Sequence, residues 1–139
     1  MGTTPAAASA TLSRLPPQNI EAEQGVLGSL LLAQGAIDKV ADFLKPDDFY
    51  RPAHQTIFGA MLTLFSRTEP LDLVTVANQL QAENRLEEIG GAAYLAGLAD
   101  IVPVASNIIH YARIVRDKSV LRQLIKATSE IAGRCYEEQ

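Results

Sequence analysis

The sequence lacks the features that indicate export or membrane insertion. It has a single cysteine, Cys135, so it cannot form an internal disulfide, and this fits a reducing cytoplasm. No uninterrupted apolar run approaches the ~18 residues that a membrane-crossing helix needs. The N-terminal segment also lacks the basic start and apolar middle of a secretory signal. We therefore expect a cytoplasmic protein with no membrane contact.

The motifs of common enzyme classes are missing as well. The nine glycines form no phosphate-binding loop of the Walker type, and no lysine follows a glycine. Two scattered histidines, His54 and His110, and one cysteine do not suggest a zinc site. His54 begins an apolar stripe, which favours a hydrogen-bonded core histidine, whereas His110 is expected to be exposed. We expect no catalytic site, no metal and no cofactor in this chain.

An excess of basic side chains is also absent. The net charge is −4, the wrong sign for a chain that grips nucleic acid through its phosphates, so DNA binding should be weak or absent. Residues 1–106 hold 6 basic and 12 acidic side chains, and residues 107–139 hold 6 basic and 4 acidic ones. This contrast is compatible with intermolecular docking, although solvated helix faces would also produce it. The acidic pairs Asp47-Asp48 and Glu87-Glu88 are interpreted as solvated carboxylates.

The spacing of apolar residues predicts an all-α protein. Residues 1–18 are rich in Ala, Thr, Ser and Pro and are expected to form a flexible tail. Residues 19–103 show helical spacing without sustained two-residue alternation, which predicts a compact head of about five helices. Asn19 and Asp72 are predicted N-caps. The helices are expected from residue 19 onward, at 36–44, from 53, from 73, and at 92–101, the last being buried on most sides.

Two short consecutive helices, 73–83 and 92–101, raise the possibility of a helix-turn-helix. Their connection is longer than the usual turn of ~3–4 residues. The second helix, GAAYLAGLAD, carries no basic or amide side chain that could read a base edge. This interpretation is therefore rejected.

The last segment, 104–139, is predicted to be one long helix. After Pro103, Ser106 can cap a segment that runs without Gly or Pro to Gly133. About 30 residues span ~45 Å at ~1.5 Å per residue, whereas a globule of ~100 residues has a radius of gyration near 13 Å. The helix should therefore extend beyond the head.

The apolar residues of this helix form two adjacent stripes that cover an arc of ~160° at ~100° per residue. An arc this wide that extends past the globule needs more than one packing partner. The alternative, that it packs only against the rest of this chain, stays open. The stripes are Val120, Leu124, Ala127 and Ile131, and Leu121, Ile125, Thr128, Ala132 and Cys135.

Five segments together resemble the N-terminal domain of bacterial DnaB-type replicative DNA helicases. Their order and spacing match the family over about residues 14–136. The segments are LPPQNIEAEQGVLGSLLL (15–32), DDFYRPAHQTIFGAML (47–62), EPLDLVTVANQL (69–80), EEIGGAAYLAGLAD (87–100) and ASNIIHYARIVRDKSVLRQLI (105–125).

The resemblance implies a non-catalytic assembly domain within a larger enzyme. The parent would be a ring-shaped hexamer that unwinds duplex DNA with ATP and Mg²⁺, using a RecA-like motor domain that is absent from this chain. The N-terminal domains would form a collar and bind the C-terminal domain of primase. Segment 104–139 would be the first arm of a helical hairpin. The alternative function is a helical domain that binds single-stranded DNA directly.

Candidate interface residues combine this resemblance with the residue pattern. Tyr94 is the only aromatic residue of helix 92–101, and Ile125 and Ile131 lie near the margins of the apolar arc. These three are predicted primase contacts, although they could also be core or dimer residues. Arg122 and Lys126 are predicted rim charges. A dimer of this chain is expected to form through four residues of the arc, namely Val120, Leu121, Leu124 and Ala127.

Overall fold

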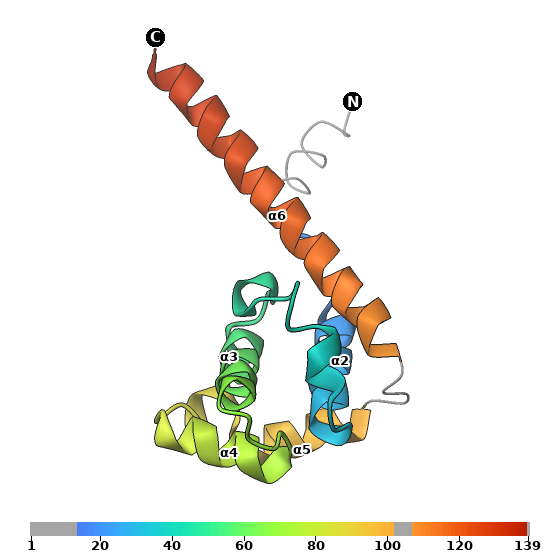
Figure 1. Cartoon of the computed structure of the whole chain (residues 1–139). Helices are drawn as coiled ribbons and strands as arrows, with labels where there is room; N and C mark the ends of the chain where they lie inside the picture. The colour runs from blue at the N-terminus through green and yellow to red at the C-terminus, as the bar shows by residue number, and fades with distance from the viewer. Residues whose placement is uncertain (1–13, 102–106, 139) are drawn as a thin grey trace, which may run out of the picture.

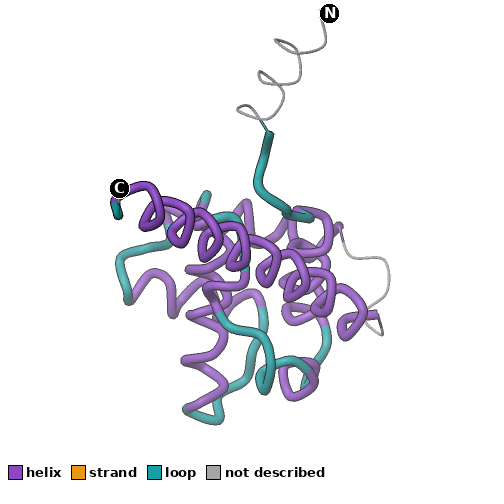
Figure 2. Tube along the Cα trace, turned by 90° about the horizontal axis from the view of Figure 1, so that it is seen from above, coloured by secondary structure: helices purple, strands orange, loops and turns teal. Residues whose placement is uncertain are grey.

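The computed structural model describes residues 14–101 and 107–138, and it is all-α, as predicted. Figure 1 shows a head from which one long helix extends, and Figure 2 shows only helices and loops in the described ranges. The five α-helices of these ranges are α2 (Ile20–Leu32), α3 (Pro52–Ser66), α4 (Leu73–Ala82), α5 (Gly91–Ile101) and α6 (Ile108–Glu137). Three short 3₁₀ helices connect them: η1 (Ala36–Lys39), η2 (Pro46–Asp48) and η3 (Glu87–Ile89).

Helix α2 is the central element of the head. Nine of its 13 residues are buried, because α2 packs against α3, α5 and α6. The predicted N-cap is confirmed, since Asn19 Oδ1 accepts a hydrogen bond of 2.9 Å from the N–H of Ala22. A side chain at Gly25 would place its Cβ 2.9 Å from the ring of Tyr111 in α6. Glycine at this position therefore allows the long helix to lie directly against α2.

Helices α3 and α4 close the other side of the head. Pro52 stands at the first position of α3, where its missing N–H costs no helix hydrogen bond. The buried stripe of α3 contains His54, Ile57, Phe58, Met61 and Leu64. Asp72 caps α4 as predicted: its Oδ1 accepts from the N–H of Thr75 at 2.9 Å, and its own N–H donates to Thr75 Oγ1 at 2.8 Å.

Two details of the head differ from the sequence-based expectations. Segment 36–44 is a single 3₁₀ helix followed by turns, entered through Gly35 at φ +78°. Helix α5 is not buried on most sides: only Leu95 and Leu98 are fully buried, whereas Ala92, Ala93, Asp100 and Ile101 are exposed. The reason is its place at the edge of the head, where α5 packs against α2 and α4 and leaves its remaining face to solvent.

Helix α6 crosses the head and then leaves it, as predicted. It contains 30 residues, and its buried residues end at Ser119. Beyond that point its ribbon continues away from the other helices (Figure 1). The predicted cap Ser106 lies outside the described residues, as does the tail up to residue 13. Segment 120–137, called the arm below, is the part of α6 that protrudes.

Candidate oligomer and partner interface

The arm exposes the apolar arc that the sequence predicts. The exposed fraction is 55% for Leu124, 52% for Ile125 and 62% for Ile131. Ala127 is also exposed, and Val120 and Leu121, at the base of the arm, are less exposed than Leu124. The alternative in which this arc packs only against the rest of the chain is therefore wrong for the described residues of the arm.

A bare helix of this kind is physically costly. Most helix stability in proteins comes from packing an amphipathic face rather than from intrinsic helix propensity. The arm receives no such packing from the described head residues, because every arm residue except Arg122 is exposed. Contiguous exposed apolar surface on a protein commonly marks an interaction site. The arm is thus the main candidate interface.

The base of the arm is held by a buried carboxylate. Asp48 Oδ1 accepts hydrogen bonds of 2.8 Å from Arg116 Nη1 and Ser119 Oγ, and its Oδ2 accepts one of 2.8 Å from the N–H of Lys45. Asp48 is only 2% exposed. The interpretation of Asp47-Asp48 as a solvated pair is therefore correct for Asp47, which is exposed, and wrong for Asp48.

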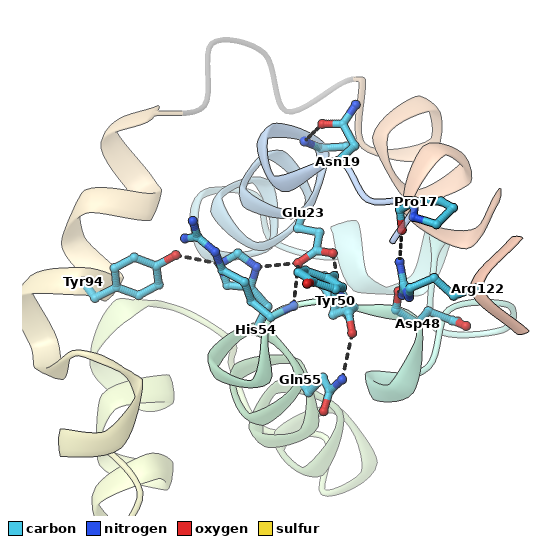
Figure 3. Close-up of polar contacts among 12 residues, drawn as sticks. Pro17, Asn19, Glu23, Asp48, Tyr50, His54, Gln55, Tyr94 and Arg122 are labelled. Carbon is cyan, nitrogen blue, oxygen red and sulfur yellow. Dashed lines mark hydrogen bonds and ion pairs between the residues drawn. The ribbon is translucent and has the colours of Figure 1, made fainter. Parts of the chain in front are cut away.

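Arg122 ties three segments together at the same place. Its Nη1 donates to the carbonyl of Pro17 at 2.7 Å, and its Nη2 donates to the carbonyl of Asp48 at 2.7 Å. Its guanidinium also lies over the ring of Tyr50, 5.5 Å from the ring centroid. Figure 3 shows Arg122 directed at Pro17 and Asp48. The side chain predicted to be a rim charge is thus already held by internal contacts, and its role toward a partner stays a prediction.

Segment 14–17, called the strap below, forms one wall of a groove at the base of the arm. The opposite wall contains Arg122, Ile125 and Lys126, and the cavity between them has a volume of about 620 Å³. The structure therefore brings three of the five predicted partner contacts together. Ile131 lies farther along the same helix, and Tyr94 lies in α5 on the opposite side of the close-up from Arg122 (Figure 3).

Tyr94 belongs to a polar network inside the head that sequence reasoning missed. Its hydroxyl lies 2.6 Å from Nε2 of His54, and Nδ1 of His54 lies 2.7 Å from Oε1 of Glu23. Since an ionised carboxylate can only accept hydrogen bonds, Nδ1 carries a proton, and Nε2 of a neutral ring accepts from the tyrosine. Glu23, His54 and Tyr94 thereby connect α2, α3 and α5 (Figure 3).

Glu23 also satisfies the backbone at the start of α3. Its Oε2 accepts a 2.6 Å hydrogen bond from the N–H of Tyr50, and its Oε1 accepts a longer one of 3.4 Å from the N–H of Arg51. Glu23 is 1% exposed and His54 is fully buried. The expectation of a hydrogen-bonded core histidine is confirmed. The sequence feature that could have predicted this network is the position of Glu23, which lies next to the apolar stripe of α2 rather than on a solvated face.

We expect Tyr94→Phe to lower the free energy of unfolding by about 1–2 kcal/mol, because it leaves Nε2 of the buried His54 without its partner. Urea denaturation followed by circular dichroism measures this change. Tyr136→Phe is the matched control, because Tyr136 is 75% exposed on the arm and should change stability by less than about 0.5 kcal/mol. Equal changes in the free energy of unfolding for the two variants would show that the Tyr94 hydroxyl contributes nothing to the stability of the network.

The other candidate features carry no site. His110 is exposed, as expected, and so are Glu87 and Glu88, with Glu88 in a 3.4 Å ion pair to Arg85. Within residues 14–101 and 107–138, no cluster of three or more His, Cys, Asp or Glu is placed to hold a metal ion. The helices of these ranges include none that is long and apolar enough to span a membrane.

Comparisons with known proteins point to one family. A family model described as the DnaB-like helicase N terminal domain matches residues 15–117. The replicative DNA helicase DnaB of Geobacillus stearothermophilus is 55% identical over 123 residues, which make up 88% of this chain and 27% of that protein. The replicative DNA helicase DnaC of Bacillus subtilis is 53% identical over the same shares of the two chains. The chain thus spans about a quarter of the length of these relatives.

Solved structures agree with these matches. The N-terminal domain of DnaB helicase from Mycobacterium tuberculosis superimposes with a TM-score of 0.87 and 47% identity, covering 89% of each chain. A DnaB-like replicative helicase, described together with its interactions with primase, superimposes with a TM-score of 0.75 and 27% identity. The latter match covers 84% of this chain and 27% of that one.

Proposed function

This chain belongs to the DnaB-like helicase N-terminal domain family, and from this premise we propose that it is a non-catalytic assembly and primase-docking domain. Its relatives are full-length replicative DNA helicases. The longer protein is proposed to be a ring-shaped hexamer that unwinds duplex DNA. Its motor domain, which would bind ATP and Mg²⁺, is proposed to follow this chain, and its location is proposed to be cytoplasmic.

The observation that carries the assembly role is the exposed apolar face of the arm. Leu121 and Leu124 are about half exposed, so burying them against a second copy would remove apolar area from water at roughly 25 cal/mol per Å². A dimer with two-fold symmetry would use the same face of both arms. We propose that Val120, Leu121, Leu124 and Ala127 form this contact.

The primase-docking role draws support from a relative and from the exposed residues of α6. The solved DnaB-like helicase is described together with its interactions with primase. In this chain Ile125 and Ile131 are more than half exposed, which makes them available to a partner. We propose that these two residues, with Lys126 at the rim, contact the C-terminal domain of primase. Tyr94 and Arg122 are proposed to contribute mainly by holding the surface in shape, since both are engaged in internal contacts.

We expect Ile125→Ala and Ile131→Ala each to weaken binding of the primase C-terminal domain by about 1–2 kcal/mol. Because both side chains are more than half exposed, the melting temperature should change little. Isothermal titration calorimetry measures the affinity, and thermal denaturation measures the stability.

Leu32→Ala provides the matched control, because Leu32 is an exposed aliphatic residue at the end of α2, with 56% of its surface accessible. This variant should leave the affinity for primase unchanged. If Ile125→Ala, Ile131→Ala and Leu32→Ala all bind primase as tightly as the wild type, the docking surface does not include the arm and this part of the proposal is wrong.

A further inference from the structure

The groove at the base of the arm combines an apolar lining with a strong positive charge. Its lining includes the cations Arg14, Arg122 and Lys126, together with Leu15, two prolines and Ile125. No carboxylate is among the described residues that line it. This concentration of positive charge is unusual for a chain whose net charge is −4.

The groove is also preformed. Pro16 and Pro17 fix two backbone φ angles of the strap and have no N–H groups. Arg122 clamps the carbonyl of Pro17 at 2.7 Å, which holds the strap beside α6. A ligand that enters this groove therefore needs to order little of the protein, and low ordering cost favours binding. Without N–H groups at these two positions, the strap offers few donors for strand pairing, so side chains must provide most of the contacts.

We propose that this groove binds an acidic amphipathic protein segment, with carboxylates facing Arg14 and Lys126 and one or two aliphatic side chains resting on Leu15 and Ile125. Arg122, whose Nη groups bind the carbonyls of Pro17 and Asp48, adds its positive charge beside them. Leu15 is 70% exposed and Ile125 is 52% exposed, so both can lose accessible area when such a segment docks. The described lining contains three cations and no carboxylate, and this charge favours an acidic occupant. The inference rests on the proposed docking function and names the chemistry that the base of the arm recognises.

A nucleic-acid strand fits the same groove less well. Proteins that bind single strands combine an extended positive groove with aromatic side chains on which bases stack. The groove lining contains no aromatic residue among the described positions, and the nearby ring of Tyr50 is already covered by the guanidinium of Arg122. Three cations also provide few phosphate contacts, and the rest of the chain carries an excess of negative charge.

The test selects peptides from a random displayed library against the intact chain. Selection should enrich sequences in which Asp or Glu flank Leu, Ile or Phe. Fluorescence anisotropy of one enriched, labelled peptide should then show binding to the wild type and about tenfold weaker binding to Lys126→Glu. Arg113→Glu is the matched control, because Arg113 is an exposed residue of the same helix outside the groove, and the same charge reversal there should leave the affinity unchanged.

Several results would overturn the inference. One is enrichment of peptides without acidic residues, and another is equal loss of affinity in Lys126→Glu and Arg113→Glu. Competition by single-stranded DNA at high salt would identify nucleic acid as the occupant. A change in oligomer mass caused by Lys126→Glu, with peptide affinity unchanged, would identify a second copy. Primase binding by the same variants is measured separately, so peptide binding that persists while primase fails to bind would contradict only the docking function.

Discussion

Replacing Glu23 with alanine is expected to lower the free energy of unfolding by about 3–5 kcal/mol, because two buried hydrogen-bonding groups lose their partner. The carboxylate is 1% exposed and accepts from Nδ1 of His54 at 2.7 Å and from the N–H of Tyr50 at 2.6 Å. Its removal leaves Nδ1 of the fully buried His54 and the N–H of Tyr50 without their partner, and each unsatisfied buried group costs about 1–3 kcal/mol. The three helices that meet at this network would lose their common polar contact.

Urea denaturation followed by circular dichroism tests this expectation. Glu21→Ala is the control, since Glu21 lies two residues before Glu23 on α2, is exposed, and should contribute less than about 1 kcal/mol through the helix dipole. Glu23→Gln keeps the shape of the side chain and one acceptor oxygen. Its free energy of unfolding should therefore lie between that of Glu21→Ala and that of Glu23→Ala. Equal stability of the two alanine variants would show that the network contributes nothing to the fold.

The second large effect is expected in assembly. Leu124→Asp should convert a dimer of the wild-type chain into a monomer, because it places a charge in the middle of the apolar face of the arm. Leu124 is 55% exposed within one chain, so the substitution should leave the helical content and the melting temperature of the head nearly unchanged. Multi-angle light scattering measures the mass at ~100 μM, a concentration at which a dimer with a Kd of about 1 μM, equivalent to ~8 kcal/mol, would be almost fully formed.

Val74→Asp is the matched control for this experiment. Val74 is 66% exposed on α4, in the head rather than on the arm, so its replacement should leave the dimer intact. If Val74→Asp dissociates the dimer and Leu124→Asp does not, the dimer interface lies in the head rather than on the arm. A monomeric wild-type chain at this concentration would contradict the proposed dimer of the arm.

Local patterns in the sequence were enough to predict the elements of this fold. Apolar residues at three- and four-residue spacing predict helices because an α-helix has ~3.6 residues per turn. Asn19 and Asp72 could be identified as caps because capping joins side chains and N–H groups only three residues apart. The protruding arm was also predictable, since a long uninterrupted helical segment exceeds the radius of a small globule.

The same local reasoning failed at 36–44 and at α5. Both are short segments whose conformation or burial depends on neighbours. Segment 36–44 is entered through Gly35 in the left-handed region and forms one 3₁₀ helix of 4 residues, followed by turns, before Lys45 and Pro46. Helix α5 is almost entirely apolar, yet composition does not reveal that it lies at the edge of the head with one face in solvent.

The polar groups that hold the molecule together were decided by tertiary structure alone. Glu23 meets His54 across 31 residues of sequence, and Asp48 meets Ser119 across 71. Arg122 reaches Pro17 across 105 residues. A charged residue on a helix has the same local pattern whether it faces water or a buried partner, so sequence spacing favoured solvated carboxylates and a free rim arginine. Local residue patterns thus predict which segments are helical and where the apolar faces lie, whereas the packing of distant segments sets which charges are buried and what they bind.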